Sequence, residues 1–142
     1  MFMNDWGYIR PETVSSYISF VRKKTDWTYD PGDNSIHSLQ AEGVAGIWNR
    51  LNEHKLAILA DEVGMGKTMQ AFGVCALLWN IKPDARIIVL APNHSVAQNW
   101  ENEYKTFIES HYKLEDNLVR TEIGKNAIHE PVLCGNLDRM AD

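Results

Sequence analysis

The sequence lacks long hydrophobic runs. Its uninterrupted apolar stretches are a few residues long, far below the ~18 residues that a membrane helix requires. The first residues do not combine a basic segment with a following apolar segment, so no signal peptide is indicated. We therefore expect a soluble, intracellular protein that does not engage a membrane.

Cysteine and positive charge are also scarce. The 142 residues include two cysteines, Cys75 and Cys134, and neither belongs to a CxxC pair or to a Cys/His cluster with zinc-ligand spacing. We interpret both as reduced residues in or near the core. The 14 Lys and Arg residues face 19 Asp and Glu residues, which gives a net charge of −5. This balance argues against a polybasic nucleic-acid binder, although it leaves room for a small basic groove.

Turn-forming residues divide the chain near position 35. The segment 30–35, Asp-Pro-Gly-Asp-Asn-Ser, is the densest in turn formers. Before it, residues 11–24 carry apolar side chains at helical spacing and predict a helix. We interpret Arg22, Lys23 and Lys24 as its solvated, basic end, although they could contact phosphates. The pattern predicts a helical N-terminal appendage and linker over residues 1–35 and the main domain over residues 36–142.

The main domain alternates between helical patterns and short apolar runs. Helical spacing predicts a helix from Ser38, a helix from Lys67 to about Asn80, and a helix capped by Ser95. The runs Leu56–Ala60 and Ile87–Ala91 have strand length and no polar alternation, which is typical of buried parallel strands. The order strand, loop, helix, strand, helix predicts an α/β fold, a three-layer sandwich with a parallel sheet covered by helices.

Residues 61–68, Asp-Glu-Val-Gly-Met-Gly-Lys-Thr, lie between an apolar run and a helix, the context of a phosphate-binding loop. Gly64 and Gly66 let the backbone curl so that its N–H groups point at a polyphosphate, and the following helix adds its positive end. Lys67 offers a charge to the phosphates and Thr68 a hydroxyl to Mg²⁺. The strict pattern has glycine where Asp61 stands, and the alternative interpretation is an ordinary glycine-rich turn.

The segment 58–70, Ile-Leu-Ala-Asp-Glu-Val-Gly-Met-Gly-Lys-Thr-Met-Gln, resembles motif I of Swi/Snf-type helicase-like ATPases, a branch of superfamily-two helicases. Their sequences typically read I-L-A-D-E-M-G-L-G-K-T-x-Q, so the Asp-Glu pair separates this branch from most P-loop proteins. Gln40 resembles the upstream glutamine of the family, 67 − 40 = 27 residues before Lys67. Residues 88–92 and 98–107 resemble motif Ia and its helix. The resemblance covers about residues 38–108.

The resemblance implies an incomplete P-loop, RecA-like lobe that binds ATP or ADP with Mg²⁺. It implies that Gln40 reads adenine, whereas a surface amide is the alternative. It also implies that the loop after the second apolar run touches a nucleic-acid backbone, although His94 could equally be a plain loop histidine; this loop comprises Pro92, Asn93, His94 and Ser95. Thr68 is the expected Mg²⁺ ligand. Lys67 is the only residue expected to take part in catalysis. The expected nucleotide-binding residues are Gln40, Asp61, Glu62, Val63, Gly64, Met65, Gly66, Lys67 and Thr68.

Aromatic and histidine side chains outside these motifs are interpreted structurally. We expect core or hinge packing for Trp27 and Tyr29, and core packing for a helical stripe formed by Trp100, Tyr104 and Phe107. Four histidines without metal-ligand spacing are expected at the surface, namely His37, His54, His111 and His129.

An acidic motif that a helicase-like ATPase needs is missing. Such enzymes hold Mg²⁺ and orient water with a D-E-x-H or D-E-x-D segment, but the only Asp-Glu pair here is Asp61-Glu62. We therefore expect the ATP-binding front portion of a DNA-dependent ATPase or translocase that cannot hydrolyse ATP alone. Its expected partners are double-stranded DNA in the full-length parent, with weak or absent DNA binding by this portion alone, and the remainder of the ATPase or other subunits. A non-enzymatic nucleotide-binding or docking module is the alternative. The absence of long basic tails favours the bacterial cytoplasm, with the nucleus as the alternative.

Overall fold

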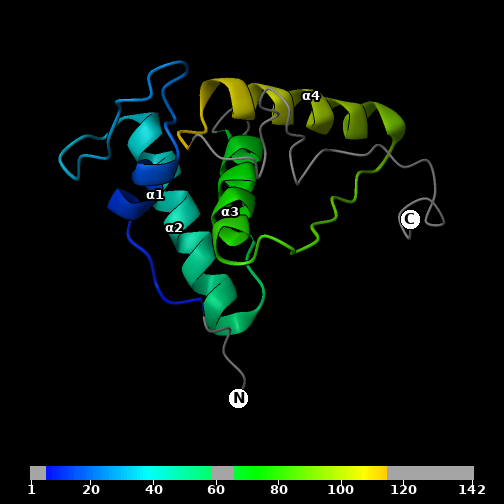
Figure 1. Ribbon diagram of the computed structural model, residues 1–142, viewed down its shortest axis with the longest axis horizontal. Helices are drawn as coiled ribbons and strands as arrows, with labels where there is room; N and C mark the ends of the chain where they lie inside the picture. Colours follow the sequence, from blue (N-terminus) through cyan, green and yellow to red (C-terminus); the bar gives the residue numbers. More distant parts are fainter. Residues whose placement is uncertain (1–5, 59–65, 115–142) are drawn as a thin grey trace.

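Four helices dominate the part of the chain that the computed structural model describes, residues 6–58 and 66–114 (Figure 1). They are α1 (Pro11–Tyr17), α2 (Ile36–His54), α3 (Lys67–Ile81) and α4 (His94–Ser110). Each lies where helical spacing predicts a helix, but two starts and one end differ. α1 stops at Tyr17, well before Lys24. α2 is capped by Ser35 rather than Ser38, and α4 by Asn93 rather than Ser95. Both caps accept a hydrogen bond from a backbone N–H of the first turn, which stabilises the helix start.

The helices pack on one another directly. α1 lies against α2 and α3, α2 lies beside α3, and α4 crosses the upper end of α3 (Figure 1). A glycine brings α3 close to its neighbours, because a Cβ atom at Gly73 would lie 3.0 Å from Ile18 Cδ1 and 3.2 Å from Val44 Cγ2. The predicted division at residues 35 and 36 stays a prediction.

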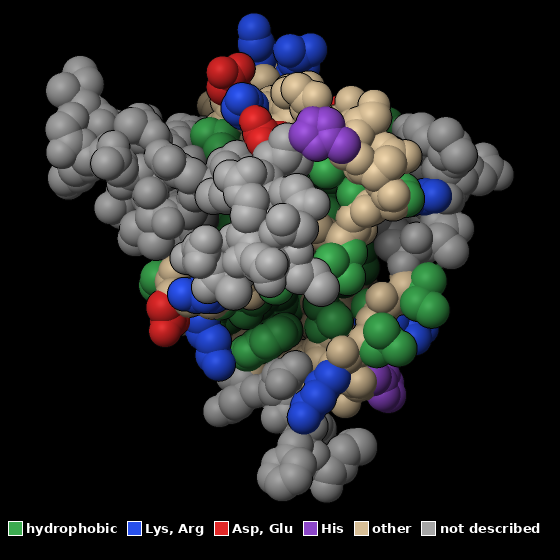
Figure 2. Space-filling view, turned by 90° about the vertical axis from the view of Figure 1, so that its right-hand side faces the viewer, with side chains coloured by type: hydrophobic (Ala, Val, Ile, Leu, Met, Phe, Trp, Pro, Cys, Tyr) green, Lys and Arg blue, Asp and Glu red, His purple; other side chains and the backbone are tan. Residues whose placement is uncertain are grey.

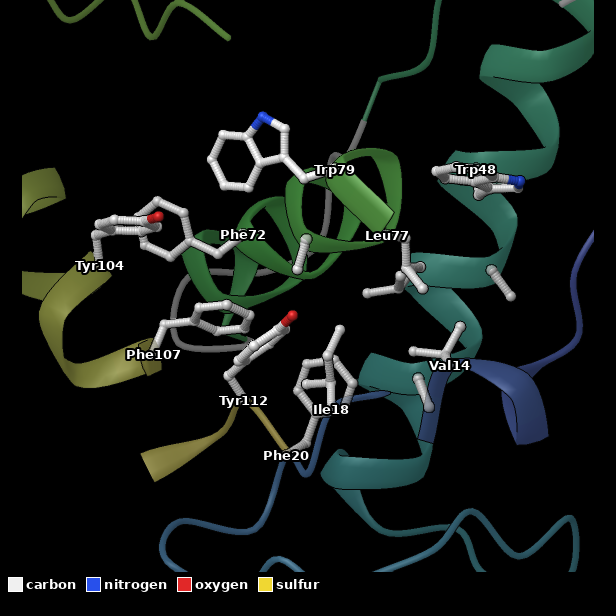
Figure 3. Packing of buried hydrophobic residues seen from close by; sticks show 14 residues of the cluster. Val14, Ile18, Phe20, Trp48, Phe72, Leu77, Trp79, Tyr104, Phe107 and Tyr112 are labelled. Atoms are coloured by element: carbon white, nitrogen blue, oxygen red, sulfur yellow. The ribbon is translucent and has the colours of Figure 1, made fainter. Parts of the chain in front are cut away.

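Aromatic side chains fill the core between α3 and α4 (Figure 3). Phe72 on α3 lies with its ring centroid 5.4, 5.2 and 5.7 Å from those of Trp100, Tyr104 and Phe107. Pairs at such separations add to the energy of burial. Tyr104 and Phe107 are buried, and Trp100 is half-buried against them, so the expected aromatic stripe is confirmed. Aliphatic side chains such as Val14 and Val44 complete the core towards α1 and α2.

The predicted α/β fold, a RecA-like sandwich with a parallel sheet, is wrong for the described residues. They form no sheet, and their only strand pairing is an isolated antiparallel bridge between Ile18 and Tyr112. Residues 87–91 are not a strand, and Ile88, Val89 and Leu90 are 62%, 47% and 81% exposed. Leu56 and Ile58 are also exposed, and residues 59 and 60 lie outside the described residues. A strand needs a neighbouring backbone to pair with, and none of the described segments provides one.

Two segments distant in sequence close the upper end of the molecule. After α1, Ser19 N donates to His111 O at 2.8 Å and Lys23 N to Ser110 O at 3.0 Å. In return, Lys113 N donates to Tyr17 O at 2.9 Å. These bonds fix the segment after α1 against the end of α4.

The residues before α1 are tied to α2 by side-chain amides. Ile9 N donates to Asn49 Oδ1 at 2.9 Å, and Asn49 Nδ2 donates to Ile9 O at 3.0 Å. The indole N–H of Trp48 donates to Gly7 O, and Asn52 Oδ1 accepts from Trp6 N. Asn49 therefore satisfies both backbone groups of Ile9, as a neighbouring strand would.

The surface mixes charged, polar and apolar side chains (Figure 2). Hydrophobic side chains reach this face between polar ones. Ile81 and residues 88–90 are among the exposed apolar residues of the described chain. Among the helices of residues 6–58 and 66–114, none is both long and apolar enough to cross a bilayer.

Candidate nucleotide site

The start of α3 forms the described part of the predicted phosphate site. Gly66 precedes the helix with a φ of 73°, a left-handed conformation that glycine adopts without strain. Having no side chain, it cannot cap the helix, and no side-chain cap is present. Lys67 and Thr68 follow in the first turn and are half-buried. The first N–H groups of α3 thus remain suited to an anion, as the helix dipole also favours.

Gln40 on α2 lies directly against this helix start. A Cβ atom at Gly66 would overlap Nε2 of Gln40 and would lie 3.2 Å from its Cδ. Gln40 is largely buried, at 8% exposure. The structure therefore brings the predicted adenine-reading residue to the residue that precedes Lys67, although 26 positions separate them in sequence (66 − 40 = 26).

A second glutamine makes the reciprocal contact. Gln70 on α3 is 1% exposed, and its Oε1 occupies the space that a Cβ atom at Gly43 of α2 would fill. Each helix thus presents a glutamine to a glycine of its neighbour, and we call Gln40, Gly43, Gly66 and Gln70 the glutamine clasp. The clasp fixes how far along α2 the first turn of α3 lies, because either helix could slide only by displacing a buried amide.

Residues 61–65 of the predicted loop lie outside the described residues, so Asp61, Glu62, Val63, Gly64 and Met65 stay predictions. The described remainder fits a nucleotide phosphate. It combines a glycine in the left-handed conformation with a helix start that has no side-chain cap. The Lys67 amine and the Thr68 hydroxyl follow in the first turn. Within the described residues, no three side chains of His, Cys, Asp or Glu cluster as a metal site would require.

The predicted nucleic-acid loop lies apart from this site. Pro92, Asn93, His94 and Ser95 are all exposed, and the start of α4 lies at the far right of Figure 1, away from the start of α3. Asn93 Oδ1 accepts a hydrogen bond from Val96 N at 2.9 Å. The first turn of α4 therefore carries its own cap, unlike that of α3.

The aromatic residues upstream of Gln40 pack as expected. Trp27 and Tyr29 are partly buried against the core. The Trp27 ring meets His37 edge-on with a centroid separation of 6.4 Å. The Tyr29 hydroxyl donates to Glu42 Oε1 at 2.6 Å, and this bond to a carboxylate raises the pKa of Tyr29 to about 12.

Sequence reasoning missed two buried polar residues. His111 was expected at the surface, but it is 8% exposed, and its Nδ1 lies 2.7 Å from Ser19 O. Burial lowers the pKa of His111 below its ordinary value of 6.5, the Ser19 carbonyl opposes this, and Arg22 lowers the pKa further. Motif I contains Gln70 but predicts no buried role for it. Its position on the apolar face of α3, together with Gly43 on α2, was the available signal.

Comparison with known proteins identifies the family. The family described as "Type III restriction enzyme, res subunit" matches residues 33–136. Chromodomain-helicase-DNA-binding protein 8 of Homo sapiens is 33% identical over 76 residues, which are 54% of this chain and 3% of that protein. Probable ATP-dependent DNA helicase CHR12 of Arabidopsis thaliana is 37% identical over 76 residues, 53% of this chain and 7% of that protein. Helicase SWR1 of Saccharomyces cerevisiae is 34% identical over 73 residues, 51% of this chain and 5% of that protein.

The chain thus spans less than a tenth of the length of these relatives. No solved structure matches it at a significant level. Since the family match covers more than half of the chain, the chain belongs to the type III restriction enzyme res subunit family, and its relatives place it among the helicase-like ATPases of Swi/Snf type.

Proposed function

We propose that this chain is the ATP-binding front portion of a DNA-dependent ATPase. The observation that carries the proposal is the contact of the Gln40 amide with Gly66, immediately before Lys67 and Thr68. An amide both donates and accepts hydrogen bonds, as the edge of adenine requires. Residues suited to a base and to phosphates therefore meet at one helix start. The relatives include a protein named as an ATP-dependent DNA helicase, which supports this assignment.

The proposed roles divide between base, phosphate and metal. Gln40 selects adenine, Lys67 neutralises phosphate charge, and the Thr68 hydroxyl is a ligand for Mg²⁺. The bound Mg²⁺ would neutralise charge on the phosphates. Asp61 to Met65 complete the loop in this proposal. The contact of Gln40 with Gly66 lets occupation of the base site affect the backbone that meets the phosphates.

The proposed nucleic-acid partner is double-stranded DNA, contacted in the parent protein through Pro92, Asn93, His94 and Ser95. The three relatives named above come from human, plant and yeast, which favours the nucleus over the bacterial cytoplasm that the lack of basic tails suggested. The alternative, a docking module that binds nucleotide without turnover, shares the same site.

Nucleotide titration followed by amide NMR tests the proposal. With Mg²⁺ and ATP at millimolar concentration, we expect shifts at Gly66 to Met69 and at the side-chain amide of Gln40. Lys67→Ala is expected to abolish these shifts. Gln40→Ala is expected to leave phosphate-dependent shifts but to remove the preference for ATP over GTP. A folded protein whose amides at these positions do not respond to nucleotide would contradict the assignment.

A pair of glycine variants separates the site from general backbone strain. Gly7 and Gly66 have φ values of 74° and 73°, but only a Cβ at Gly66 meets Gln40, whereas a Cβ at Gly7 meets nothing within 4 Å. Both alanine variants carry the strain of a left-handed residue, about 1–2 kcal/mol. We expect Gly66→Ala to lose nucleotide binding and Gly7→Ala to retain it.

A further inference from the structure

Arg22, Lys23 and Lys24 form an exposed turn rather than the predicted end of a helix. α1 ends at Tyr17, and the three residues follow in the loop that leads towards α2. All three are exposed, and within the described residues no carboxylate forms an ion pair with them. We call residues 22–24 the basic turn. In a chain with a net charge of −5, three adjacent cations without ion-pair partners need a physical explanation.

The backbone of the basic turn is held at several points. Lys23 N donates to Ser110 O at 3.0 Å, and Lys24 N donates to Val21 O at 3.2 Å. The carbonyl of Lys24 accepts from the Ser19 hydroxyl at 2.6 Å and from Trp27 N at 3.1 Å. A loop fixed in this way presents its side chains from a defined position.

Lys23 has a strained backbone conformation. Its φ of 58° lies in the left-handed region, which costs a non-glycine residue on the order of 1–2 kcal/mol. Asn or Gly would meet less strain at this position. The chain nevertheless has a lysine here, between two further cations. Strain of this kind is typical of functional positions, although it does not name the ligand.

Lys113 adds a fourth cation at the same corner. Its backbone N–H donates to Tyr17 O, and its amine donates to Trp27 O. Burial lowers the pKa of Lys113, and Asp26 raises it. Asp26 therefore acts on Lys113 and forms no ion pair with the basic turn.

We propose that the basic turn binds the phosphodiester backbone of a nucleic acid. Successive phosphates form a dense line of negative charge, and contact with them needs positioned cations but no base-specific groups. Figure 1 shows the loop between α1 and α2 at the upper left and the start of α4 at the far right. The basic turn is thus a contact separate from Pro92 to Ser95. The proposal rests on the DNA engagement proposed above but not on nucleotide binding.

Salt-dependent binding of the full 142-residue chain to a fluorescent DNA duplex tests the proposal. At about 20 mM salt we expect the variant Arg22→Gln/Lys23→Gln/Lys24→Gln to bind at least ~10-fold more weakly. Its slope of log affinity against log salt should be smaller by about 2–3, because each neutralised phosphate contributes about 0.9. A matched control removes the same charge elsewhere, from the exposed residues Arg50, Lys82 and Arg86. This control is expected to keep the slope of the parent.

The single variant Lys23→Asn tests whether a loss of folding, rather than a loss of charge, explains weaker DNA binding. Asn tolerates the left-handed conformation, so this variant should be at least as stable as the parent to heat, yet bind DNA several-fold more weakly. The proposal would be overturned if both triple variants lost DNA affinity to the same extent, or if the parent chain did not bind the duplex at low salt. So would a basic turn that binds polyglutamate but not the duplex, because the partner would then be an acidic protein segment. Normal nucleotide shifts in the same variants would show that the proposed ATP site still stands.

Discussion

At the residue scale, His111 is a buried titratable group whose pKa folding lowers. Its Nδ1 faces the Ser19 carbonyl at 2.7 Å, and because a carbonyl only accepts, Nδ1 carries the proton. Burial is the main cause of the lowered pKa, so the folded protein favours the neutral ring. The unfolded chain protonates near 6.5, and therefore binds the proton more readily than the folded one. The stabilisation is complete above this pH and is lost as the pH falls below it.

We expect His111→Asn to weaken the acid sensitivity of the fold. Asn offers an N–H to the Ser19 carbonyl but does not titrate. Between pH 7 and pH 5, the urea concentration at the unfolding midpoint should therefore fall less in this variant than in the parent. Urea unfolding at several pH values measures this effect. His54→Asn is the control, because His54 is exposed and its Nε2 lies 3.3 Å from Glu53 Oε2 at the surface. An unchanged pH dependence in His111→Asn would contradict the interpretation.

At the element scale, the glutamine clasp fixes α2 against α3. Gly43 and Gly46 lie one turn apart on α2, yet their surroundings differ. A Cβ at Gly43 overlaps the Gln70 amide oxygen, whereas a Cβ at Gly46 meets nothing within 4 Å. One glycine permits helix contact, and the other lowers helix stability without a compensating contact.

Alanine at these two positions is expected to have opposite effects. Gly46→Ala should stabilise the protein by about 0.5–1 kcal/mol, because glycine costs that much inside a helix. Gly43→Ala should destabilise it by about 1–3 kcal/mol, since the buried amide of Gln70 must move. Urea unfolding at neutral pH gives both values. Two variants stabilised to the same degree would show that the clasp does not exist.

The helices could be predicted from sequence because helical spacing is a local property. Every helix lies where apolar residues recur at that spacing, and Gly66 marks the start of α3 as expected. The presence or absence of strands could not be predicted in this way. Residues 87–91 are apolar like a buried strand, but a strand also needs a partner, which local sequence does not reveal. At the site, Lys67 and Thr68 followed from a motif. The buried roles of Gln70 and His111 depend on Gly43 and Ser19, which lie far away in sequence.

At the scale of the whole molecule, we expect the chain alone not to turn over ATP. In the proposed site Gly66, Lys67 and Thr68 would contact the phosphates, and the sequence contains no D-E-x-H or D-E-x-D segment to hold the metal and orient water. Losing one such group costs on the order of 10³-fold. A phosphate-release assay with and without duplex DNA, with Lys67→Ala as control, measures this. DNA-stimulated release that Lys67→Ala abolishes would contradict the expectation.

The pairing of Ser19 with His111 joins residues 92 positions apart, and this has a consequence for synthesis on the ribosome. At roughly 5–20 residues per second, a ribosome needs on the order of 5–20 s to deliver the second partner after the first. During that interval Ser19 and Lys23 have no carbonyl of His111 or Ser110 to bind. The upper end of the fold can close only after translation has passed α4. A nascent chain that stalls before that point exposes the backbone N–H groups of Ser19 and Lys23, which the finished protein pairs with the end of α4.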